Sequence, residues 1–309
     1  MTSHQQSDQH GHGHGHAHAH GHAHGYVPDP DFDWDALAAH LEHEADLRAA
    51  AVTEATRWLS ALYGHGPERA DGVRRVLDIG SGPGVIAGLL ADAFPAAEVV
   101  AVDQSAALLE RARTRSGGRL ATRQADLPAE FDKLGEADLI WSGNAIHHLG
   151  DQQAALTSLA GLLRPGGLLA VAERGLPARY LPRDVGLGRP GLQSRLDAAH
   201  EDVFNAMRDE LPGSTEEIED WPAMLERAGL TPSGTRTFLI DRPAPLDRRT
   251  REYLRTQLAR LQDRLADSLS PEDRTTLEAL LDEDAPTGIL HRPDAFYLSA
   301  MTVHTARKT

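Results

Sequence analysis

The sequence predicts an α/β protein built on a parallel, doubly wound β-sheet. Two observations support this fold class. Between residues 73 and 172, short apolar runs alternate with helical stretches, and the first run leads into a glycine-rich turn at Gly80–Gly84 that opens a helix. Strands buried on both faces are continuous apolar runs, and helices that connect them as crossovers give a parallel sheet.

Size, charge and cysteine content limit the classes of function. The chain has 309 residues, 40% of them hydrophobic, which is enough for a sizeable core. A net charge of −15, from 31 basic and 46 acidic residues, disfavours nucleic acid and anionic membrane surfaces as partners. The absence of cysteine excludes thiolate catalysis and cysteine-bound metals. With no signal-peptide core and no run of 18 apolar residues, we expect a cytoplasmic protein without a membrane partner.

The N-terminal part divides into a tail and a helical segment. Residues 1–30 alternate His with Gly or Ala before a Pro-containing end, a composition that predicts a disordered tail. From Trp34 to about Leu62, apolar residues recur at helical spacing, which predicts one long or two short amphipathic helices. A break at Gly64–Pro67 follows. We expect residues 31–309 to form a single domain, with segments at 31–66, 73–174, 175–230 and 231–309.

The central segment contains the predicted strands and helices. The strands are Val73–Ile79, Glu98–Asp103, Leu120–Ala125, Ala137–Ser142 and Gly167–Ala172, and the helices are Pro83–Phe94, Ser105–Thr114 and Asp151–Leu163. The third helix has clear ends, because Asp151 can cap it and Pro165–Gly166–Gly167 can stop it. A strand must therefore follow it immediately.

The C-terminal part has a looser pattern. A loop rich in Pro, Gly and Arg (Gly175–Gly191) leads to a helix through Met207, a helix over Glu216–Ala228, and strands at Thr235–Ile240 and Phe296–His304. A helical insertion at residues 247–282 separates these strands. Its Leu254, Leu258, Leu261 and Leu265 form a stripe that could pair with a second subunit as a homodimer. Ser270, Pro271 and Asp273 begin its second helix as cap, first-turn proline and capping-box acid.

The segment Val76–Gly84 (VLDIGSGPG) carries the sharpest functional signal. Glycines in such a turn let the backbone approach a ligand, because a side chain would occupy the ligand's volume. A dinucleotide site requires a third glycine or alanine at position 85, which is Val85 here, so a pyrophosphate is disfavoured. Asp78 would repel a pyrophosphate but suits a sulfonium or amino group. The alternative is a purely structural tight turn.

Two further carboxylates follow predicted strands. Asp103 closes the second strand, where a carboxylate can accept hydrogen bonds from the two hydroxyls of a ribose. Asp126 follows the third strand, and the carboxyl ends of these strands share one sheet edge. Asp126 could instead be a surface turn residue before Pro128. Contact with a cofactor is the preferred interpretation of both.

Together these residues resemble the class I S-adenosylmethionine-dependent methyltransferases, closely over Val73–Arg174 and loosely in the final strands. LDIGSGPG resembles their cofactor loop, AVDQS their ribose-binding acid, QAD their adenine-side acid, and LLRPGG the turn before their fifth strand. The segment Ser142–Leu149 (SGNAIHHL) is similar to the fourth-strand exit of the small-molecule branch, which includes the ubiquinone and menaquinone biosynthesis methyltransferases.

The resemblance implies a fold, a cofactor and a reaction. The fold would be a Rossmann-like, mostly parallel seven-stranded sheet with an antiparallel last strand at Phe296–His304. The reaction would be in-line transfer of a methyl group to a small molecule beneath a helical lid formed by residues 31–66 and 175–230. S-Adenosylmethionine would be contacted by Asp78, Gly80, Ser81, Gly82, Gly84, Asp103, Gln104, Ala125, Asp126, Leu127 and Asn144. The Asn-Pro-Pro-Tyr motif of DNA amino-methylating enzymes is absent, and magnesium-binding acids are not evident near Trp141–Asn144.

Several polar or aromatic residues are candidates for catalysis or for binding the acceptor. His147 or His148 could act as a base if the acceptor must lose a proton, or both could cap the following helix and pack. The stretch from Arg174 to Arg195 contains Arg179, Arg183 and Arg189, which could attract an anionic substrate or could pair with the acids of Asp197–Asp220. Tyr26 and Trp34 could cover the substrate, or could staple the first helix.

The histidine tail suggests a different class of function. We expect no metal site in the folded core, but imidazoles at every second position can bind nickel, zinc or copper weakly, or the tail could be a passive extension. These residues are His10, His12, His14, His16, His18, His20, His22 and His24. One alternative to a methyltransferase is therefore a metal-binding or metal-delivery protein that acts through its tail. The other is a nicotinamide-dependent oxidoreductase, which the glycine spacing disfavours.

Overall fold

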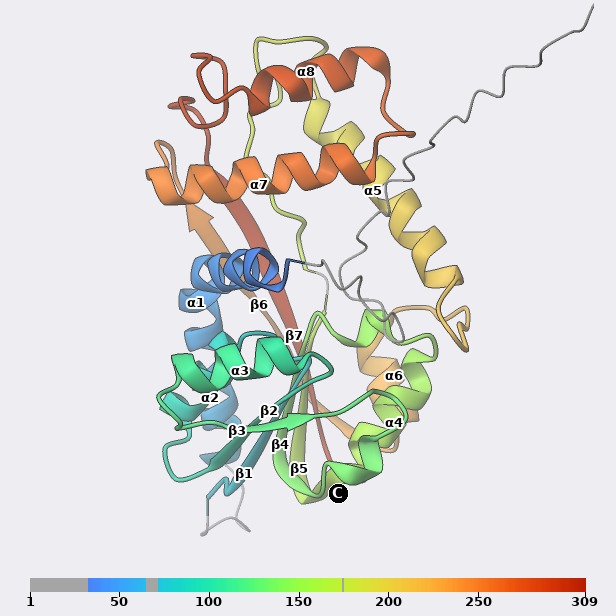
Figure 1. Ribbon diagram of the computed structural model, residues 1–309. Helices are drawn as coiled ribbons and strands as arrows, with labels where there is room; N and C mark the ends of the chain where they lie inside the picture. The colour runs from blue at the N-terminus through green and yellow to red at the C-terminus, as the bar shows by residue number, and fades with distance from the viewer. Residues whose placement is uncertain (1–32, 65–71, 174) are drawn as a thin grey trace, which may run out of the picture.

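The computed structural model describes residues 33–64, 72–173 and 175–309. In this part of the chain, seven strands form one sheet in the order β3-β2-β1-β4-β5-β7-β6 (Figure 1). The strands are β1 (Arg75–Ile79), β2 (Glu98–Asp103), β3 (Ala121–Gln124), β4 (Ala137–Gly143), β5 (Leu163–Ala172), β6 (Thr231–Arg242) and β7 (Tyr297–Arg307). β1 to β5 are parallel, whereas β7 is antiparallel to both β5 and β6. The predicted doubly wound sheet with an antiparallel last strand is confirmed.

Eight α-helices accompany the sheet in the described residues. They are α1 (Trp34–Gly64), α2 (Val85–Ala93), α3 (Ala106–Arg115), α4 (Gln152–Leu162), α5 (Leu192–Asp209), α6 (Trp221–Arg227), α7 (Arg248–Arg264) and α8 (Pro271–Leu281). Two short 3₁₀ turns, η1 (Phe131–Lys133) and η2 (Ile146–His148), lie between strands and helices. The helical pattern predicted from Trp34 to Leu62 is one continuous helix.

Two apolar layers cover the two faces of the sheet. Successive side chains on a strand point to opposite faces, so Val76 and Leu139 pack in the layer that contains α1 and α2. Leu77 and Ile140 pack in the other layer, with α4 and α6. This alternation explains why apolar residues occupy consecutive positions in the central strands.

The largest differences from the predicted boundaries occur in β5, β6 and α6. β5 begins at Leu163, directly after α4, so Pro165 and Gly166, which were predicted to precede the strand, lie inside it. β6 extends from Thr231 to Arg242 because β7 pairs with it along its whole length, although most of its side chains are exposed. α6 begins at Trp221, five residues later than predicted, and the Asp220 carboxylate caps it by accepting a hydrogen bond from the backbone N–H of Ala223.

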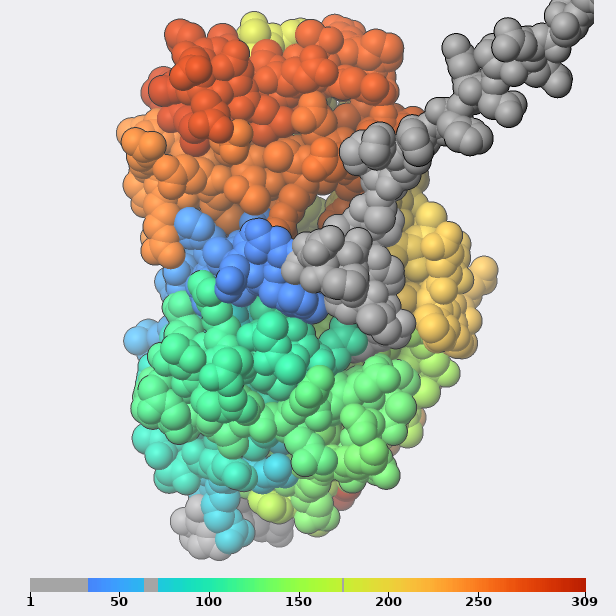
Figure 2. Space-filling model, in the orientation of Figure 1, coloured from blue at the N-terminus to red at the C-terminus, as the bar shows by residue number. Residues whose placement is uncertain are grey.

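The helical insertion lies beyond the carboxyl ends of the strands, with α7 next to α1 and α8 above α7 (Figures 1 and 2). Leu254, Leu258 and Leu265 are fully buried, and Leu261 is partly buried against the same core. The leucine stripe that we expected to be offered to a second subunit is therefore used within this chain.

The start of α8 departs from the predicted capping box. Ser270 caps the helix as expected, because its hydroxyl accepts a hydrogen bond from the backbone N–H of Asp273. The Asp273 carboxylate does not accept from the backbone N–H of the cap residue. It accepts from the Ser270 hydroxyl and forms a two-point ion pair with Arg195, which joins α5 to α8.

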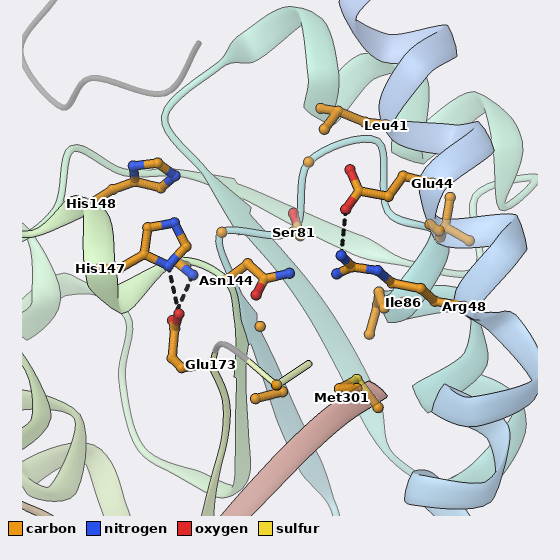
Figure 3. A pocket seen from close by; sticks show the side chains of 18 of the residues that line it. Leu41, Glu44, Arg48, Ser81, Ile86, Asn144, His147, His148, Glu173 and Met301 are labelled. Carbon is orange, nitrogen blue, oxygen red and sulfur yellow. Dashed lines mark hydrogen bonds and ion pairs between the residues drawn. The ribbon is translucent and has the colours of Figure 1, made fainter. Parts of the chain in front are cut away.

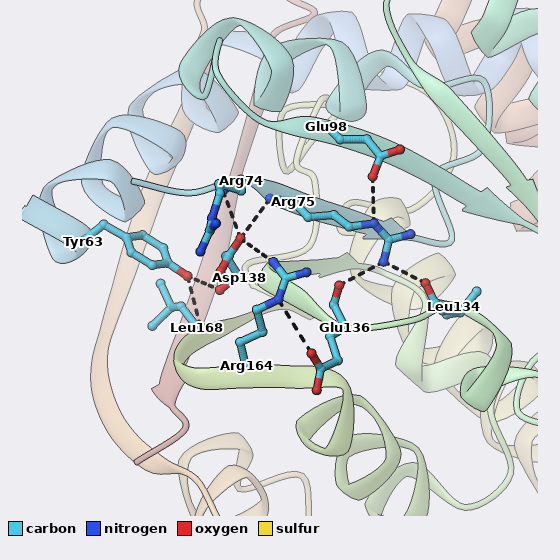
Figure 4. Close-up of polar contacts among 9 residues, drawn as sticks. All are labelled: Tyr63, Arg74, Arg75, Glu98, Leu134, Glu136, Asp138, Arg164 and Leu168. Atoms are coloured by element: carbon cyan, nitrogen blue, oxygen red, sulfur yellow. Dashed lines mark hydrogen bonds and ion pairs between the residues drawn. The ribbon is translucent and has the colours of Figure 1, made fainter. Parts of the chain in front are cut away.

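At the end of the sheet where the parallel strands begin, a polar network around Asp138 holds the strands in place (Figure 4). The Asp138 carboxylate accepts hydrogen bonds from the backbone N–H groups of Arg74 and Arg75 and from the Arg164 guanidinium, at 2.9–3.0 Å. The Tyr63 hydroxyl, at the end of α1, donates to the Asp138 carbonyl oxygen. The network ties α1 to the sheet and leaves the carboxyl ends of the strands for the site.

Candidate functional site

A cavity of about 540 Å³ opens at the carboxyl ends of the parallel strands (Figure 3). Its volume lies within the range of small-molecule sites, roughly 300–1,000 Å³. Segments that are far apart in the sequence meet there: α1, the turn after β1, the ends of β2 to β5, α5, and the final strands. Among the residues predicted to bind the cofactor, those on the wall are Gly80, Ser81, Gly82, Asp103, Gln104, Ala125, Leu127 and Asn144.

The three glycines of the first turn share a left-handed backbone, and two of them pack closely against other parts of the chain. Gly80, Gly82 and Gly84 all have positive φ angles, of 71°, 52° and 74°. A Cβ atom at Gly80 would lie 2.6 Å from Cβ of Ala145, and one at Gly84 would lie 2.5 Å from Cβ of Ala112. Close packing against protein, rather than the volume of a ligand, therefore requires glycine at these two positions. Gly84 does not line the cavity.

Asp103 organises the glycine turn as well as lining the cavity. One oxygen of its carboxylate accepts a hydrogen bond from the backbone N–H of Gly82 at 2.8 Å, and the other accepts from Ser105 at 2.9 Å. The end of β2 therefore fixes the loop that follows β1. Asp126 behaves differently, because it is exposed and absent from the cavity wall, which its neighbours Ala125 and Leu127 line.

Asp78 lies behind the glycine turn, in a recess of about 50 Å³ that shares several wall residues with the main cavity. Its side chain is buried, and Oδ2 has no hydrogen-bond partner among the described residues. Burial, with a smaller contribution from the negative charge of Asp103, raises the pKa of Asp78 to about 7. A buried carboxylate oxygen without a hydrogen-bond partner suits a cationic group placed against it.

Arg48 and Glu44 are wall residues that the sequence reasoning missed. They lie on α1, and their charged groups are 2.7 Å apart (Figure 3). Arg48 also lines the recess that contains Asp78. A signal was present, because Leu41, Ala45 and Arg48 lie at helical spacing, so Arg48 continues the face that the two apolar residues present to the cavity.

His147 and Glu173 form a buried pair on the opposite wall. His147 Nδ1 lies 2.6 Å from Glu173 Oε2, and Glu173 Oε1 accepts hydrogen bonds from the backbone N–H groups of Ala145 and Ile146 at 2.9 and 2.8 Å. Arg208 of α5 donates to the His147 carbonyl oxygen. Glu173 was also missed, although a carboxylate that directly follows a buried strand was the signal used for Asp103.

His148 lines the cavity beside His147, with the two ring centroids 4.1 Å apart. The idea that these histidines cap the next helix is wrong, because Asp151 caps α4 by accepting a hydrogen bond from the backbone N–H of Ala154 at 2.8 Å. Between β4 and η2, Asn144 has a φ of 51°, an uncommon angle for a residue other than glycine, and it also faces the cavity.

The residues predicted to bind the substrate are not brought together. Arg179 pairs with Asp197 at 2.7 Å, Arg189 lies 3.8 Å from Asp273, and neither they nor Arg183 line the cavity. The predicted anion-attracting loop is thus not part of the wall. Trp34, at the start of α1, is also absent from it, and Tyr26 lies outside the described residues.

Other segments of the predicted lid do reach the cavity. Leu41, Glu44, Ala45 and Arg48 of α1, residues 175–178 after β5, and His200 and Glu201 of α5 all line it. Within the described residues, no group of three or more histidine or acidic side chains could hold a metal ion. None of the described helices has the length and apolarity needed to cross a membrane. The histidines of the tail lie outside the described residues.

The family comparison agrees with the fold and the cavity. Residues 76–167 match the family described as "Methyltransferase domain". This segment, which runs from β1 into β5, is a class I S-adenosylmethionine-dependent methyltransferase domain. Members of this class use S-adenosylmethionine as the methyl donor.

Individual relatives carry more specific names. A trans-aconitate 2-methyltransferase of Methylobacterium radiotolerans is 35% identical over 54% of this chain and 66% of its own length. An uncharacterized methyltransferase of Mycobacterium tuberculosis is 42% identical over 32% of this chain and 50% of its own length. The chain thus spans about one half to two thirds of the length of these curated relatives. Among solved structures, phosphoethanolamine N-methyltransferase 2 of Haemonchus contortus is similar, with 20% identity, a TM-score of 0.41, and coverage of 81% of this chain and 52% of that one.

Proposed function

We propose that this protein transfers a methyl group from S-adenosylmethionine to a small-molecule acceptor. One observation carries the proposal: a cavity at the carboxyl ends of the parallel strands is bordered by Gly82, Asp103 and Arg48, with the buried carboxylate of Asp78 in an adjoining recess. Open α/β sheets bind ligands at this edge. The names of the relatives support a small-molecule acceptor.

The polar groups of the cavity suit the parts of this cofactor. The methionine end carries both an ammonium and a carboxylate, and Asp78 and Arg48 supply the opposite charges within one recess. Asp103 borders the cavity at the end of β2, where it can accept hydrogen bonds from ribose hydroxyls. Ala125 and Leu127 supply apolar surface for the adenine. When bound, the cofactor supplies a methyl group activated by the positive sulfonium.

The chain's own contribution is to align the reactants and to exclude water. Holding an acceptor in line with a reactive carbon converts an encounter between two molecules into a step within one complex, which lowers the barrier. α1 and α5 contribute wall residues from two sides, and His147, His148 and Asn144 border the acceptor region in this proposal. The acceptor is either a carboxylate such as trans-aconitate, named in the relatives, or a compound like the substrates of the ubiquinone and menaquinone enzymes, to which Ser142–Leu149 is similar.

Calorimetry on the full chain tests this function. We expect S-adenosylmethionine and S-adenosylhomocysteine to bind with one-to-one stoichiometry and NAD to show no binding. Incubation with methyl-labelled donor and a panel of small acceptors should move label into the small-molecule fraction. Binding of the dinucleotide without binding of S-adenosylmethionine would revive the oxidoreductase alternative and refute the proposal.

A truncated chain lacking residues 1–25 tests the metal-binding alternative. If the tail is an accessory, methyl transfer continues in the shortened protein while nickel or zinc binding is lost. If neither the full chain nor the shortened one binds S-adenosylmethionine, the metal-delivery hypothesis replaces the proposed methyl transfer.

A further inference from the structure

We propose that His147, fixed in place by Glu173, is the general base of the reaction, and that the acceptor is methylated at a hydroxyl or amine that arrives protonated. A carboxylate would not need such a base. This inference rests on the proposed methyl transfer and assigns a class of acceptor to it. It also chooses between the two adjacent histidines, which the sequence leaves equivalent.

The position of Glu173 is fixed by three hydrogen bonds. Its side chain is fully buried, two backbone N–H groups donate to Oε1, and His147 Nδ1 lies 2.6 Å from Oε2. The two backbone donors belong to the segment that leads into η2, the same turn that carries His147. The carboxylate therefore sets both the path of the backbone and the orientation of the imidazole ring.

The pairing also determines which nitrogen of His147 can act as a base. An ionised carboxylate can only accept hydrogen bonds, so Nδ1 must be the donor in the 2.6 Å contact. In the neutral ring, Nε2 then carries the lone pair. Among the described residues, Nε2 has no hydrogen-bond partner, and the side chain keeps 11% of its surface exposed on the cavity wall.

The charged and titratable groups around His147 come from several elements. Glu173 follows β5, His148 shares the η2 turn, and Arg208 reaches the His147 carbonyl from α5. His200 and Glu201, also on α5, line the same cavity. Of these groups, Glu173 is the one whose side chain contacts an imidazole nitrogen of His147. The His148 ring is tilted by 54° to that of His147.

A general base has a purpose only for some acceptors. A carboxylic acid with an ordinary pKa near 4 is already ionised at neutral pH and can attack directly. A phenol, an alcohol or an ammonium group keeps its proton at that pH, so its lone pair becomes available only as a base removes the proton. An imidazole held by a buried carboxylate therefore indicates a protonated acceptor.

The charges on the wall agree with this class of acceptor. The acidic residues that line the described cavity are Glu44, Asp103, Glu173 and Glu201, whereas the one arginine or lysine among the lining side chains is Arg48, which pairs with Glu44. A tricarboxylate such as trans-aconitate would bring its negative charges next to these carboxylates. A neutral hydroxyl compound or an amine avoids that repulsion.

The proposed step balances in protons and electrons. The O–H or N–H bond of the acceptor breaks, its proton passes to Nε2 of His147, and the electron pair stays on the acceptor atom. That atom forms a bond to the methyl carbon while the carbon–sulfur bond of the donor breaks and its electron pair passes to sulfur. The imidazolium beside Glu173 then releases its proton to solvent.

The first test compares the full-length chain with its Glu173→Gln variant, in which the amide oxygen can still accept from the backbone. With a phenolic or amine acceptor, we expect kcat to fall about 10²-fold while KM changes less than about threefold. Binding of S-adenosylhomocysteine, measured by calorimetry, should stay within about threefold of that of the unaltered chain.

A spectroscopic readout distinguishes positioning from a general structural effect. In protein labelled with ¹⁵N-histidine and free of ligand, the His147 signal, assigned by its loss in His147→Gln, should show the tautomer protonated at Nδ1. In Glu173→Gln, the amide NH2 takes the place of Oε2 and donates to Nδ1, so the ring should change to the tautomer protonated at Nε2. A signal that keeps the same tautomer in both proteins would overturn the role of Glu173.

The remaining tests compare variants of the two histidines and two classes of acceptor. His147→Gln should lose about 10²-fold or more of kcat, and His148→Gln should keep the acid limb of the pH profile. This inference is wrong if His148→Gln abolishes the acid limb, or if His147→Gln methylates trans-aconitate as fast as the unaltered chain does. Either result leaves the proposed function intact. If the unaltered chain does not bind S-adenosylmethionine at all, the proposed function itself has failed.

Discussion

Glu44 and Arg48 lie one helical turn apart on α1, and their charged groups meet 2.7 Å apart on the cavity wall. Both side chains are about one quarter exposed, so the pair is accessible from the cavity without being fully solvated. Arg48 also borders the recess of Asp78. A long helix that precedes the sheet in sequence thus supplies the one arginine or lysine among the described lining residues.

Arg48→Gln should weaken the binding of S-adenosylhomocysteine. Loss of a charge-assisted hydrogen bond costs about 1.5–3 kcal/mol, equivalent to roughly 10- to 100-fold in Kd. Isothermal calorimetry measures the change. The matched control is Arg57→Gln, an exposed position on the same helix, which should leave Kd unaltered. Equal affinities for the unaltered protein and Arg48→Gln would remove Arg48 from the cofactor site.

Asp103→Asn should reduce cofactor affinity through both of its roles. The carboxylate accepts hydrogen bonds from Gly82 and Ser105, and an amide has only one oxygen to accept with. We expect Kd for S-adenosylhomocysteine to rise at least about tenfold. Asp132→Asn, at an exposed position outside the cavity, serves as the control in the same titration. An unaltered Kd in Asp103→Asn would contradict the assignment.

Gly84→Ala should destabilise the fold, because the new Cβ would lie 2.5 Å from Cβ of Ala112 at a φ of 74°. Overpacking of this kind typically costs about 1–3 kcal/mol, and the positive φ adds to it. Gly88→Ala on α2 is the matched control, since nothing lies within 4 Å of its Cβ and alanine favours a helix by about 1 kcal/mol. Urea denaturation should rank the control above the unaltered protein and Gly84→Ala below it.

Asp78→Asn should change how stability depends on pH. Below about pH 4, the carboxyl is protonated in both the folded and the unfolded chain. Between about pH 4 and pH 7, the unfolded chain releases a proton that the folded chain keeps, so the free energy of unfolding falls as pH rises, by up to about 4 kcal/mol. The variant lacks this loss. Denaturation of the cofactor-free proteins at pH 5 and pH 8 should therefore favour the variant more strongly at pH 8, and parallel pH profiles would refute the raised pKa.

The same residue predicts a second effect, on binding. If a cationic group of the cofactor lies against Asp78, binding favours the ionised carboxylate, and a proton is released between about pH 5 and pH 7. Calorimetry in buffers of different ionisation enthalpy would detect that release, which should disappear in Asp78→Asn. Identical heats in the two buffers would place the cationic end elsewhere.

The sheet was predictable because its strands are buried on both faces. β2 agrees with prediction at both ends, and β1, β3 and β4 agree within two residues, since apolar runs bounded by glycine and acidic residues leave little freedom. For β6, the prediction covered only half of the strand. Its length is set by backbone hydrogen bonds to β7, and its mostly exposed side chains give no apolar pattern that would indicate them.

The correctly predicted wall residues lie at or just after the ends of the first four strands. The glycine turn and Asp103 are adjacent in the folded chain because β1 and β2 are paired, and the sequence pattern carries that pairing. Arg48 and Glu173 were missed because they reach the cavity from a preceding helix and from the end of the fifth strand. The prediction that Arg179 and Arg189 attract the substrate was not supported. The sequence does not show that Asp197 and Asp273 lie beside them.

The position of β7 between β5 and β6 sets an order of events during synthesis of the chain. β6 leaves the ribosome before α7 and α8, but within the described chain its partner in the sheet is β7, which is made more than fifty residues later. Until β7 emerges, the nascent protein exposes both the edge of β5 and a twelve-residue strand with no neighbour. Chaperones that recognise unpaired strands would meet this protein in that interval, and a premature stop codon before Tyr297 would leave both edges open.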